Sequence, residues 1–253
     1  MIFNVYFSPT GSTKQVVEEV SKAFDQDIND IDLSDPNFVH QVIEFSKEDL
    51  IILGVPSYSG RMVVLAHRLV EKYFKGNGAK AIIIATYGNR AYDDQLVEMD
   101  DLMKQTGFEV IGGISAVCEH SIIRDVAKGR PNKKDLETLM IFGLKIKENM
   151  NQTHDIAFPG NRPYKEAKEH FPFIPLTNDQ CNGCGTCIKS CITNAIELKD
   201  GVAVTKQQDC ISCMRCIQVC PNHARMLDEN LYETVKGKMI QNCSDYKEYE
   251  LFI

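Results

Sequence analysis

The chain lacks the features of several broad classes of protein. Its apolar runs, such as residues 50–55 and 81–85, have the length of strands and are too short to span a bilayer. The N-terminus has neither the basic segment nor the long apolar segment of a secretory signal. Asp and Glu (35) outnumber Lys and Arg (28), and the formal net charge of -7 disfavours nucleic acid as a partner. We therefore expect a soluble, cytoplasmic protein with no membrane span.

Cysteine, in contrast, is plentiful, and eight of the ten cysteines form two runs with the spacing C-x2-C-x2-C-x3-C. The runs are Cys181, Cys184, Cys187 and Cys191, then Cys210, Cys213, Cys216 and Cys220. This is the bacterial spacing for two [4Fe–4S] clusters, in which the fourth cysteine of each run binds the cluster of the other run. The predicted ligand sets are Cys181, Cys184, Cys187 and Cys220 for one cluster, and Cys210, Cys213, Cys216 and Cys191 for the other.

Two other uses of these cysteines fit less well. A disulfide framework needs an oxidising compartment, and no secretory segment is seen. Zinc ribbons use separated C-x2-C pairs, so the third and fourth cysteines of each run would be surplus. Gly183 and Gly185 allow backbone N–H groups to approach cluster sulfurs. We expect Cys118 to be a buried apolar residue and Cys243 to have no ligand role.

The first 150 residues alternate between strand and helix signals. The predicted strands are residues 2–7, 27–33, 50–55, 79–85 and 109–117. The predicted helices are residues 13–24, 63–74, 93–106 and 133–150. Five strands alternating with helices predict an α/β fold whose parallel sheet has helices on both faces.

A strand-to-helix turn with hydroxyl side chains follows the first predicted strand. It reads Ser8, Pro9, Thr10, Gly11, Ser12 and Thr13. Backbone N–H groups and hydroxyls at the start of a helix form a phosphate cradle. The lysine of a GxxxxGK[ST] loop is missing, so a nucleoside triphosphate is not expected. The alternative is an ordinary helix N-terminus with turn residues.

This turn resembles the FMN-phosphate loop of flavodoxins. The loops at residues 54–61 and 86–92 correspond to those that flank the flavin ring in that family, and the resemblance covers residues 1–150. It implies a flavodoxin-like doubly wound five-stranded sheet of order 2-1-3-4-5. The FMN contacts that it implies are Ser8, Thr10, Gly11, Ser12, Thr13, Pro56, Ser57, Tyr58, Ser59, Gly60, Thr86, Tyr87, Gly88, Asn89 and Tyr92. Tryptophan, a frequent flavin-stacking residue in flavodoxins, is absent, so Tyr58, Tyr87 and Tyr92 are the aromatic side chains available.

The whole chain resembles the flavodoxin-domain ferredoxins of anaerobic bacteria, which implies FMN and two [4Fe–4S] clusters. The expected domains are a flavodoxin-like FMN-binding domain at 1–150, a proline-bearing connector at 151–176 and a small α+β ferredoxin-like domain at 177–230. This last domain is a pseudo-twofold repeat, and a hairpin is expected at Asp200-Gly201 between its cysteine runs. A tail at 231–253 is expected to pack on one of the domains, with no indication of which.

These features predict an electron-transfer protein that moves low-potential electrons between the clusters and FMN, and so couples one- and two-electron partners. The negative charge favours redox partner proteins with basic docking faces. The alternative is an FMN-dependent reductase of a small acceptor, such as a quinone or nitro-compound, although no acid–base pair stands out. A redox sensor is a third possibility. Arg61 and Arg90 would either lie by the flavin ring or be solvated, and His120 could touch cofactor or substrate.

Overall fold

Five parallel strands form the centre of the computed structural model, which describes every residue except 25, 153 and 154. They are β1 (Ile2–Tyr6), β2 (Ile28–Asp32), β4 (Leu50–Tyr58), β7 (Lys80–Tyr87) and β8 (Glu109–Val117). Their order in the sheet is β2-β1-β4-β7-β8, with every neighbouring pair parallel. Numbered along the chain this is the order 2-1-3-4-5 of flavodoxin-like doubly wound sheets, so the predicted fold class is confirmed.

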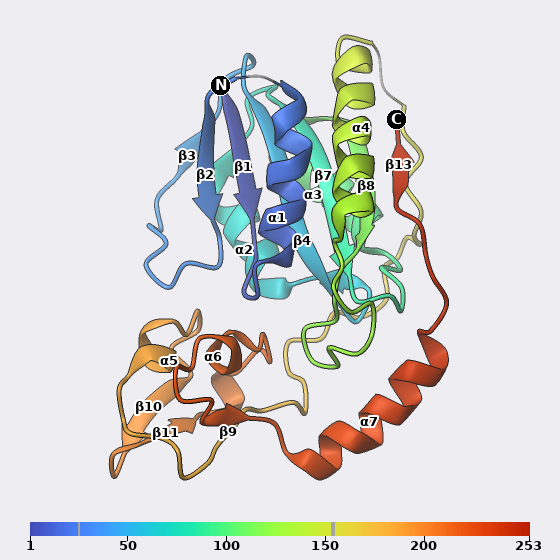
Figure 1. Ribbon diagram of the computed structural model, residues 1–253. Helices are drawn as coiled ribbons and strands as arrows, with labels where there is room; N and C mark the ends of the chain where they lie inside the picture. Colours follow the sequence, from blue (N-terminus) through green and yellow to red (C-terminus); the bar gives the residue numbers. More distant parts are fainter. Residues whose placement is uncertain (25, 153–154) are drawn as a thin grey trace.

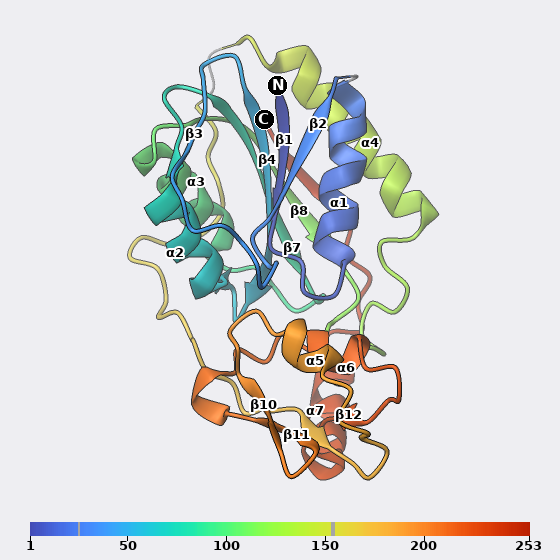
Figure 2. The same cartoon turned by 90° about the vertical axis from the view of Figure 1, so that its left-hand side faces the viewer.

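Two helices cover each face of the sheet (Figure 2). On one face lie α1 (Ser12–Ser21), with its short extension η1 (Lys22–Phe24), and α4 (Lys133–Asn149); on the other lie α2 (Val64–Tyr73) and α3 (Gln95–Gln105). The sheet buries apolar side chains on both faces. In β4, Ile51, Leu53 and Val55 pack toward α2 and α3, whereas Leu50 and Ile52 pack toward α1 and α4. This is why the strand is a continuous apolar run.

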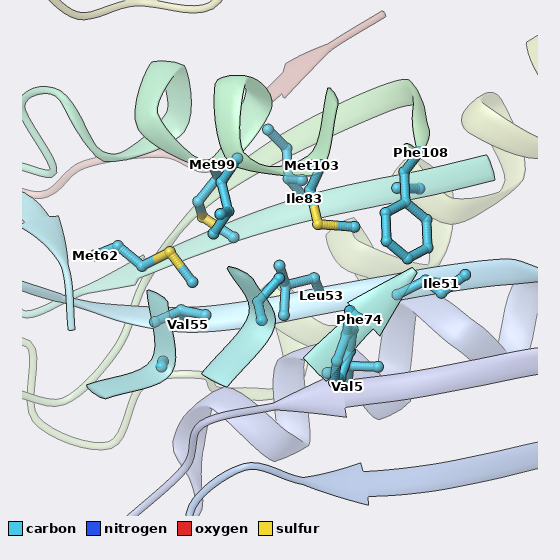
Figure 3. Close-up of a cluster of buried hydrophobic side chains, with 14 of the residues drawn as sticks. Val5, Ile51, Leu53, Val55, Met62, Phe74, Ile83, Met99, Met103 and Phe108 are labelled. Carbon is cyan, nitrogen blue, oxygen red and sulfur yellow. The ribbon is translucent and has the colours of Figure 1, made fainter. Parts of the chain in front are cut away.

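The core beneath α2 and α3 is drawn in Figure 3. There Met99 and Met103 of α3, with Phe108 just beyond it, lie over Leu53 and Ile83 of the sheet. Three short strands belong to the edges of this region: β3 (Ile43–Glu44), β5 (Arg61–Met62) and β6 (Phe74–Lys75). Among the described residues, no helix has the length and apolar character needed to cross a membrane.

The end of the chain returns to the sheet. After α7 (Glu229–Asn242), the strand β13 (Glu250–Phe252) pairs antiparallel with β8 and becomes a new edge of the sheet (Figure 1). Asn89 Nδ2 donates to the carbonyls of Cys243 (2.6 Å) and Asp245 (2.9 Å). The tail therefore packs on the flavodoxin-like part, a placement for which the sequence carried no signal.

Residues 176–226, called the cysteine region below, lie beyond the carboxyl ends of the parallel strands (Figures 1 and 2). Its elements are β9 (Leu176–Thr177), α5 (Thr186–Lys189), β10 (Ile196–Lys199), β11 (Val202–Thr205), η2 (Gln207–Asp209), α6 (Arg215–Gln218) and β12 (Arg225–Met226). β10 and β11 form the hairpin expected at Asp200-Gly201, and β9 pairs with β12. α5 and α6 stand 29 residues apart, as do the two cysteine runs.

The connector is held against the sheet part. The Asp94 carboxylate accepts from the backbone N–H groups of Asn161 (2.8 Å) and Lys165 (2.8 Å). Arg162 and Asp101 form a bidentate pair at 2.9 and 2.7 Å. These bonds hold residues 161–165 of the connector against the sheet part.

Candidate cofactor sites

The three loops that resemble flavin-binding loops surround one cavity of about 260 Å³ at the carboxyl ends of β1, β4 and β7. In open α/β sheets this is where ligands bind. Eleven of the fifteen implied FMN contacts line the cavity: Thr10, Ser12, Thr13, Pro56, Ser57, Tyr58, Ser59, Gly60, Thr86, Tyr87 and Gly88. Arg90 lines it too. We call it the shared cavity, because residues of the cysteine region also reach it.

Ser8 and Gly11 shape the first loop and do not line the shared cavity. The Ser8 hydroxyl accepts from the backbone N–H of Lys14 at 2.9 Å, and the backbone N–H of Ser8 donates to Ser34 Oγ at 3.2 Å. Gly11 is the N-cap of α1. Thr13 and Thr86 join the first and third loops through a buried hydroxyl pair at 2.8 Å. The loop is thus pre-formed, with the first turn of α1 at the cavity.

Asn89 and Tyr92 lie against the C-terminal tail instead of the shared cavity. Asn89 holds the tail carbonyls described above. Tyr92 donates its hydroxyl to Glu250 Oε2 at 2.7 Å and packs edge-on against Tyr87 with ring centroids 5.2 Å apart. Arg61 is paired with Glu98 Oε2 at 2.7 Å and stacks on the Tyr164 ring. These three residues therefore contact side chains and backbone next to the cavity and do not line it.

His120 is a cavity residue that the sequence marked only weakly. Its Nδ1 accepts from the backbone N–H groups of Ile122 (3.2 Å) and Ile123 (3.0 Å). Burial lowers its pKa to about 4, so the imidazole is neutral near pH 7 and carries its proton on Nε2. Its ring lies so close to Gly88 that a Cβ there would be 2.4 Å from the imidazole Cδ2. His120 is therefore a fixed N–H donor at the cavity wall.

The remaining cavity residues are ones that the resemblance did not name, and several come from segments beyond residue 150. Phe171 and Phe173 enter from the connector, Val235 and Met239 from α7, and Ser212 and Cys213 from the second cysteine run, while Pro9, Ala91, Cys118, Glu119, Ser121, Ile122 and Ile123 complete the lining. The one sequence signal for the connector residues was the pair of phenylalanines around Pro172 in an otherwise polar stretch.

The cysteines form two groups, and each group takes its fourth member from the other run. Cys181, Cys184, Cys187 and Cys220 line one small cavity. In the second group, burial and the neighbouring charges of Cys216, Cys191 and Cys210 together raise the pKa of the Cys213 thiol to about 12. Each group thus brings together three cysteines of one run and one cysteine of the other.

Backbone N–H groups point at the sulfurs in the same way in both halves. Ala195 N–H donates to Cys191 Sγ (3.2 Å) and Ala224 N–H to Cys220 Sγ (3.3 Å). The left-handed positions Gly183 and Gly185 recur as Ser212 and Met214, each 29 residues later. Within the described residues, no three His, Cys, Asp or Glu side chains converge on the scale of a single ion. The four cysteines of a [4Fe–4S] cluster each bind a different iron, so they need not converge on one point.

Tyr58 belongs to the second of the three flavin-type loops (residues 8–13, 54–61 and 86–92) and is close to the second cysteine group. It comes from the end of β4, and its ring packs edge-on against Phe171 at 5.7 Å. Burial raises the pKa of its hydroxyl well above the ordinary value, and the charges of Cys213 and Cys210 add to this effect. The second cysteine group therefore adjoins the shared cavity.

Arg215 connects the cysteine region to the loop at residues 8–13, which we call the phosphate-type loop. Its guanidinium donates to the carbonyls of Pro9 (3.1 Å) and Ser8 (3.3 Å), to Ser34 Oγ (2.9 Å) and to the Ser34 carbonyl. Gln218 Nε2 donates to the carbonyl of Thr10 at 3.2 Å. Both side chains belong to α6, which begins two residues after Cys213. The helix that presents the second cysteine group thus binds the loop beside the shared cavity.

Comparison with known proteins identifies the cysteine region. A family model described as a 4Fe-4S dicluster domain matches residues 174–244. A ferredoxin of Methanothermococcus thermolithotrophicus is 36% identical over 59 residues, which cover 22% of this chain and 98% of that protein. The chain belongs to the ferredoxin family. The match lies in the C-terminal part, so the chain is a ferredoxin joined to a flavodoxin-like domain.

Solved structures similar to this ferredoxin align with its N-terminal part. A flavodoxin from the domain Archaea is 19% identical, covers 60% of this chain and 99% of its own, and has a TM-score of 0.42. A Fusobacterium nucleatum flavodoxin mutant bound to flavin mononucleotide is 15% identical, covers 58% and 95%, and has a TM-score of 0.38. The flavodoxin-like fold itself follows from the strand order and the parallel pairing.

Proposed function

We propose that the protein is an electron carrier in which two [4Fe–4S] clusters and FMN exchange low-potential electrons. The observation that carries this proposal is the shared cavity, which is lined by all three flavin-type loops and by Cys213 of the second cysteine group. A cluster held by Cys213 would adjoin a flavin in that cavity. Residues 1–150 would form the FMN domain and 177–230 the two-cluster domain, joined by the connector.

Each part of the chain has a distinct task in this proposal. The first turn of α1, with the hydroxyls of Thr10, Ser12 and Thr13, would hold the FMN phosphate. Tyr58 and Tyr87 would bound the ring, with Gly88 and His120 at one wall. FMN holds one or two electrons and a cluster one, so the pair can couple one-electron and two-electron partners.

The exposure of the cysteines suggests the direction from which partners dock. Each group contains at least one buried cysteine, but Cys184 of the first group is exposed, whereas Cys213 of the second group lies at the shared cavity. A redox partner would therefore meet the cluster of Cys181, Cys184, Cys187 and Cys220 first. The second cluster would then relay the electron to FMN. The net charge of -7 favours partners with basic docking faces.

The second candidate is an FMN-dependent reductase of a small acceptor. The observation in its favour is the neutral His120, whose Nε2–H is available at the wall of the shared cavity, with Arg90 also in the lining. Arg90 is paired with Asp93 at 2.7 Å, so His120 is the hydrogen-bond donor that the wall offers to an acceptor resting on the flavin. Saturable, selective turnover of small acceptors would favour this candidate, whereas a carrier reduces them without selectivity.

The cofactor content of protein purified without oxygen tests the proposal. We expect about eight iron, about eight acid-labile sulfide and about one FMN per chain. Cys184→Ser should lower the iron and sulfide content, because Cys184 belongs to the first group. Cys243→Ser is the matched control and should keep both, because this buried cysteine belongs to neither group. Full iron without flavin, even after incubation with FMN, would overturn the proposed exchange with FMN.

A further inference from the structure

Arg225 is an arginine buried inside the ferredoxin domain. Its side chain belongs to β12, and the residue is 3% exposed. The guanidinium donates five hydrogen bonds, to the carbonyls of Ala203 (3.1 Å) and Pro175 (3.0 Å), the hydroxyls of Thr177 and Thr205, and the sulfur of Cys216 (3.9 Å). None of these five acceptors is a carboxylate. A buried charge without an opposite charge nearby is strongly unfavourable, so this cation calls for a negative partner.

The position of Arg225 supplies such partners on two sides. Its Nη2 lies 3.9 Å from Cys216 Sγ, in the second cysteine group. Arg225 also lines the small cavity of the first group, together with Cys187 and Cys220. One guanidinium therefore contacts the surroundings of both proposed clusters.

The internal repeat shows that the fold does not require an arginine at this place. The position 29 residues earlier, in the equivalent place after the first run, is Ile196. Ile196 is 5% exposed and packs in the apolar cluster with Cys187 and Cys216. Two halves that otherwise repeat closely thus differ in one buried charge.

We propose that Arg225 is a redox-tuning residue whose buried positive charge raises the reduction potentials of both clusters, and that of the Cys216 cluster most. This inference rests on the proposed pair of clusters. A cluster with four thiolate ligands is anionic and gains one more negative charge when it accepts an electron. A cation held beside it, away from water, stabilises the reduced form more than the oxidised form.

Redox titration of the intact holoprotein, with dithionite as the electron donor and electron paramagnetic resonance as the readout, tests the inference. Arg225→Ile copies the residue of the other half, and Arg225→Gln removes the charge while keeping a polar group that can donate to the threonines. Both should make reduction of the Cys216 cluster at least about tenfold less favourable, which is about 59 mV for one electron. The other cluster should shift in the same direction by a smaller amount.

Two control variants separate charge from structure. Arg225→Lys keeps the charge and should stay close to the wild-type potentials. Lys189→Met removes an exposed charge of the same domain and should shift them less than Arg225→Gln, because water and salt screen it. Unchanged potentials in an iron-replete Arg225→Gln protein would overturn the inference, and so would an Arg225→Lys shift as large as that of Arg225→Gln. Wild-type protein without iron would instead overturn the proposed function.

Discussion

Arg215 offers the sharpest test of how the two halves of the molecule are joined. The side chain is 14% exposed and makes four hydrogen bonds to the phosphate-type loop and to Ser34, with Asp32 at 3.9 Å. Arg215→Ala removes all of them at once. Water can reach the freed carbonyls only when α6 moves away, so the variant favours separation of the two halves.

The magnitude follows from the kind of bond that is lost. A hydrogen bond from a charged donor contributes about 1.5–3 kcal/mol, and four bonds from one side chain do not add fully. We take about 2–4 kcal/mol as the loss of docking free energy, which is about 30- to 900-fold in the docking equilibrium. The connector and the α7–β13 segment still tether the ferredoxin domain, so it stays attached but spends less time docked.

Anaerobic rapid mixing with dithionite provides the assay, since bleaching of the clusters and reduction of the flavin are followed at separate wavelengths. We expect Arg215→Ala to slow the passage of electrons from clusters to flavin by at least about tenfold, at unchanged iron and FMN content. Arg68→Ala is the matched control, because it removes an exposed ion pair between α2 and Glu169 of the connector, and such pairs contribute little. If Arg215→Ala transfers electrons as fast as Arg68→Ala, the docking argument is refuted.

Three further predictions concern single features of the site. Cys191 stands in the first run but belongs to the second cysteine group, so Cys191→Ala should lose the cluster beside the flavin and about half the iron. Retention of all the iron would contradict the exchange of fourth ligands between the runs. Burial lowers the pKa of His120 from 6.5 to about 4, so its contribution to the free energy of unfolding should be fully present above pH 6.5 and be lost as the pH drops toward 4. Chemical denaturation at several pH values checks this, and His120→Gln should remove about 3 kcal/mol of that dependence. Truncation after Tyr249 removes β13 and the hydrogen bonds of Glu250 to Tyr92 and Ser115. Calorimetry should then show a fall in Tm of about 4–8 °C. An unchanged Tm would mean that the tail strand does not stabilise the sheet.

The sheet was predictable because its signal is local. A strand buried on both faces is apolar throughout, as β4 is, and each of the four long helices carries its own apolar face. The predicted bounds differ from the observed ones by a few residues at most, apart from β4, which runs on to Tyr58. Alternation of these elements was enough to predict a parallel sheet with helices on both faces, whereas its strand order came from the resemblance to flavodoxins.

The contacts between the halves were not predictable, because nothing local marks them. No pattern in the sequence around Arg215 distinguishes it from a solvent-exposed arginine, and its bonds to Ser8 and Ser34 become visible only in the folded structure. The left-handed backbone at Ser212 and Met214 gives no sign in the sequence either, whereas the first run has glycines at the matching positions. The strand β13 has only three residues and takes its conformation from the free edge of β8.

The most direct test of the account is whether a cluster and the flavin exchange electrons within one molecule. A light flash that generates a one-electron reductant would reduce the clusters of protein loaded with iron and FMN. The account predicts that the flavin is then reduced with a first-order rate constant that does not change when the protein is diluted. A rate that falls in proportion to dilution would mean that electrons pass only between molecules, and it would contradict the proposed relay from the Cys213 group to the shared cavity.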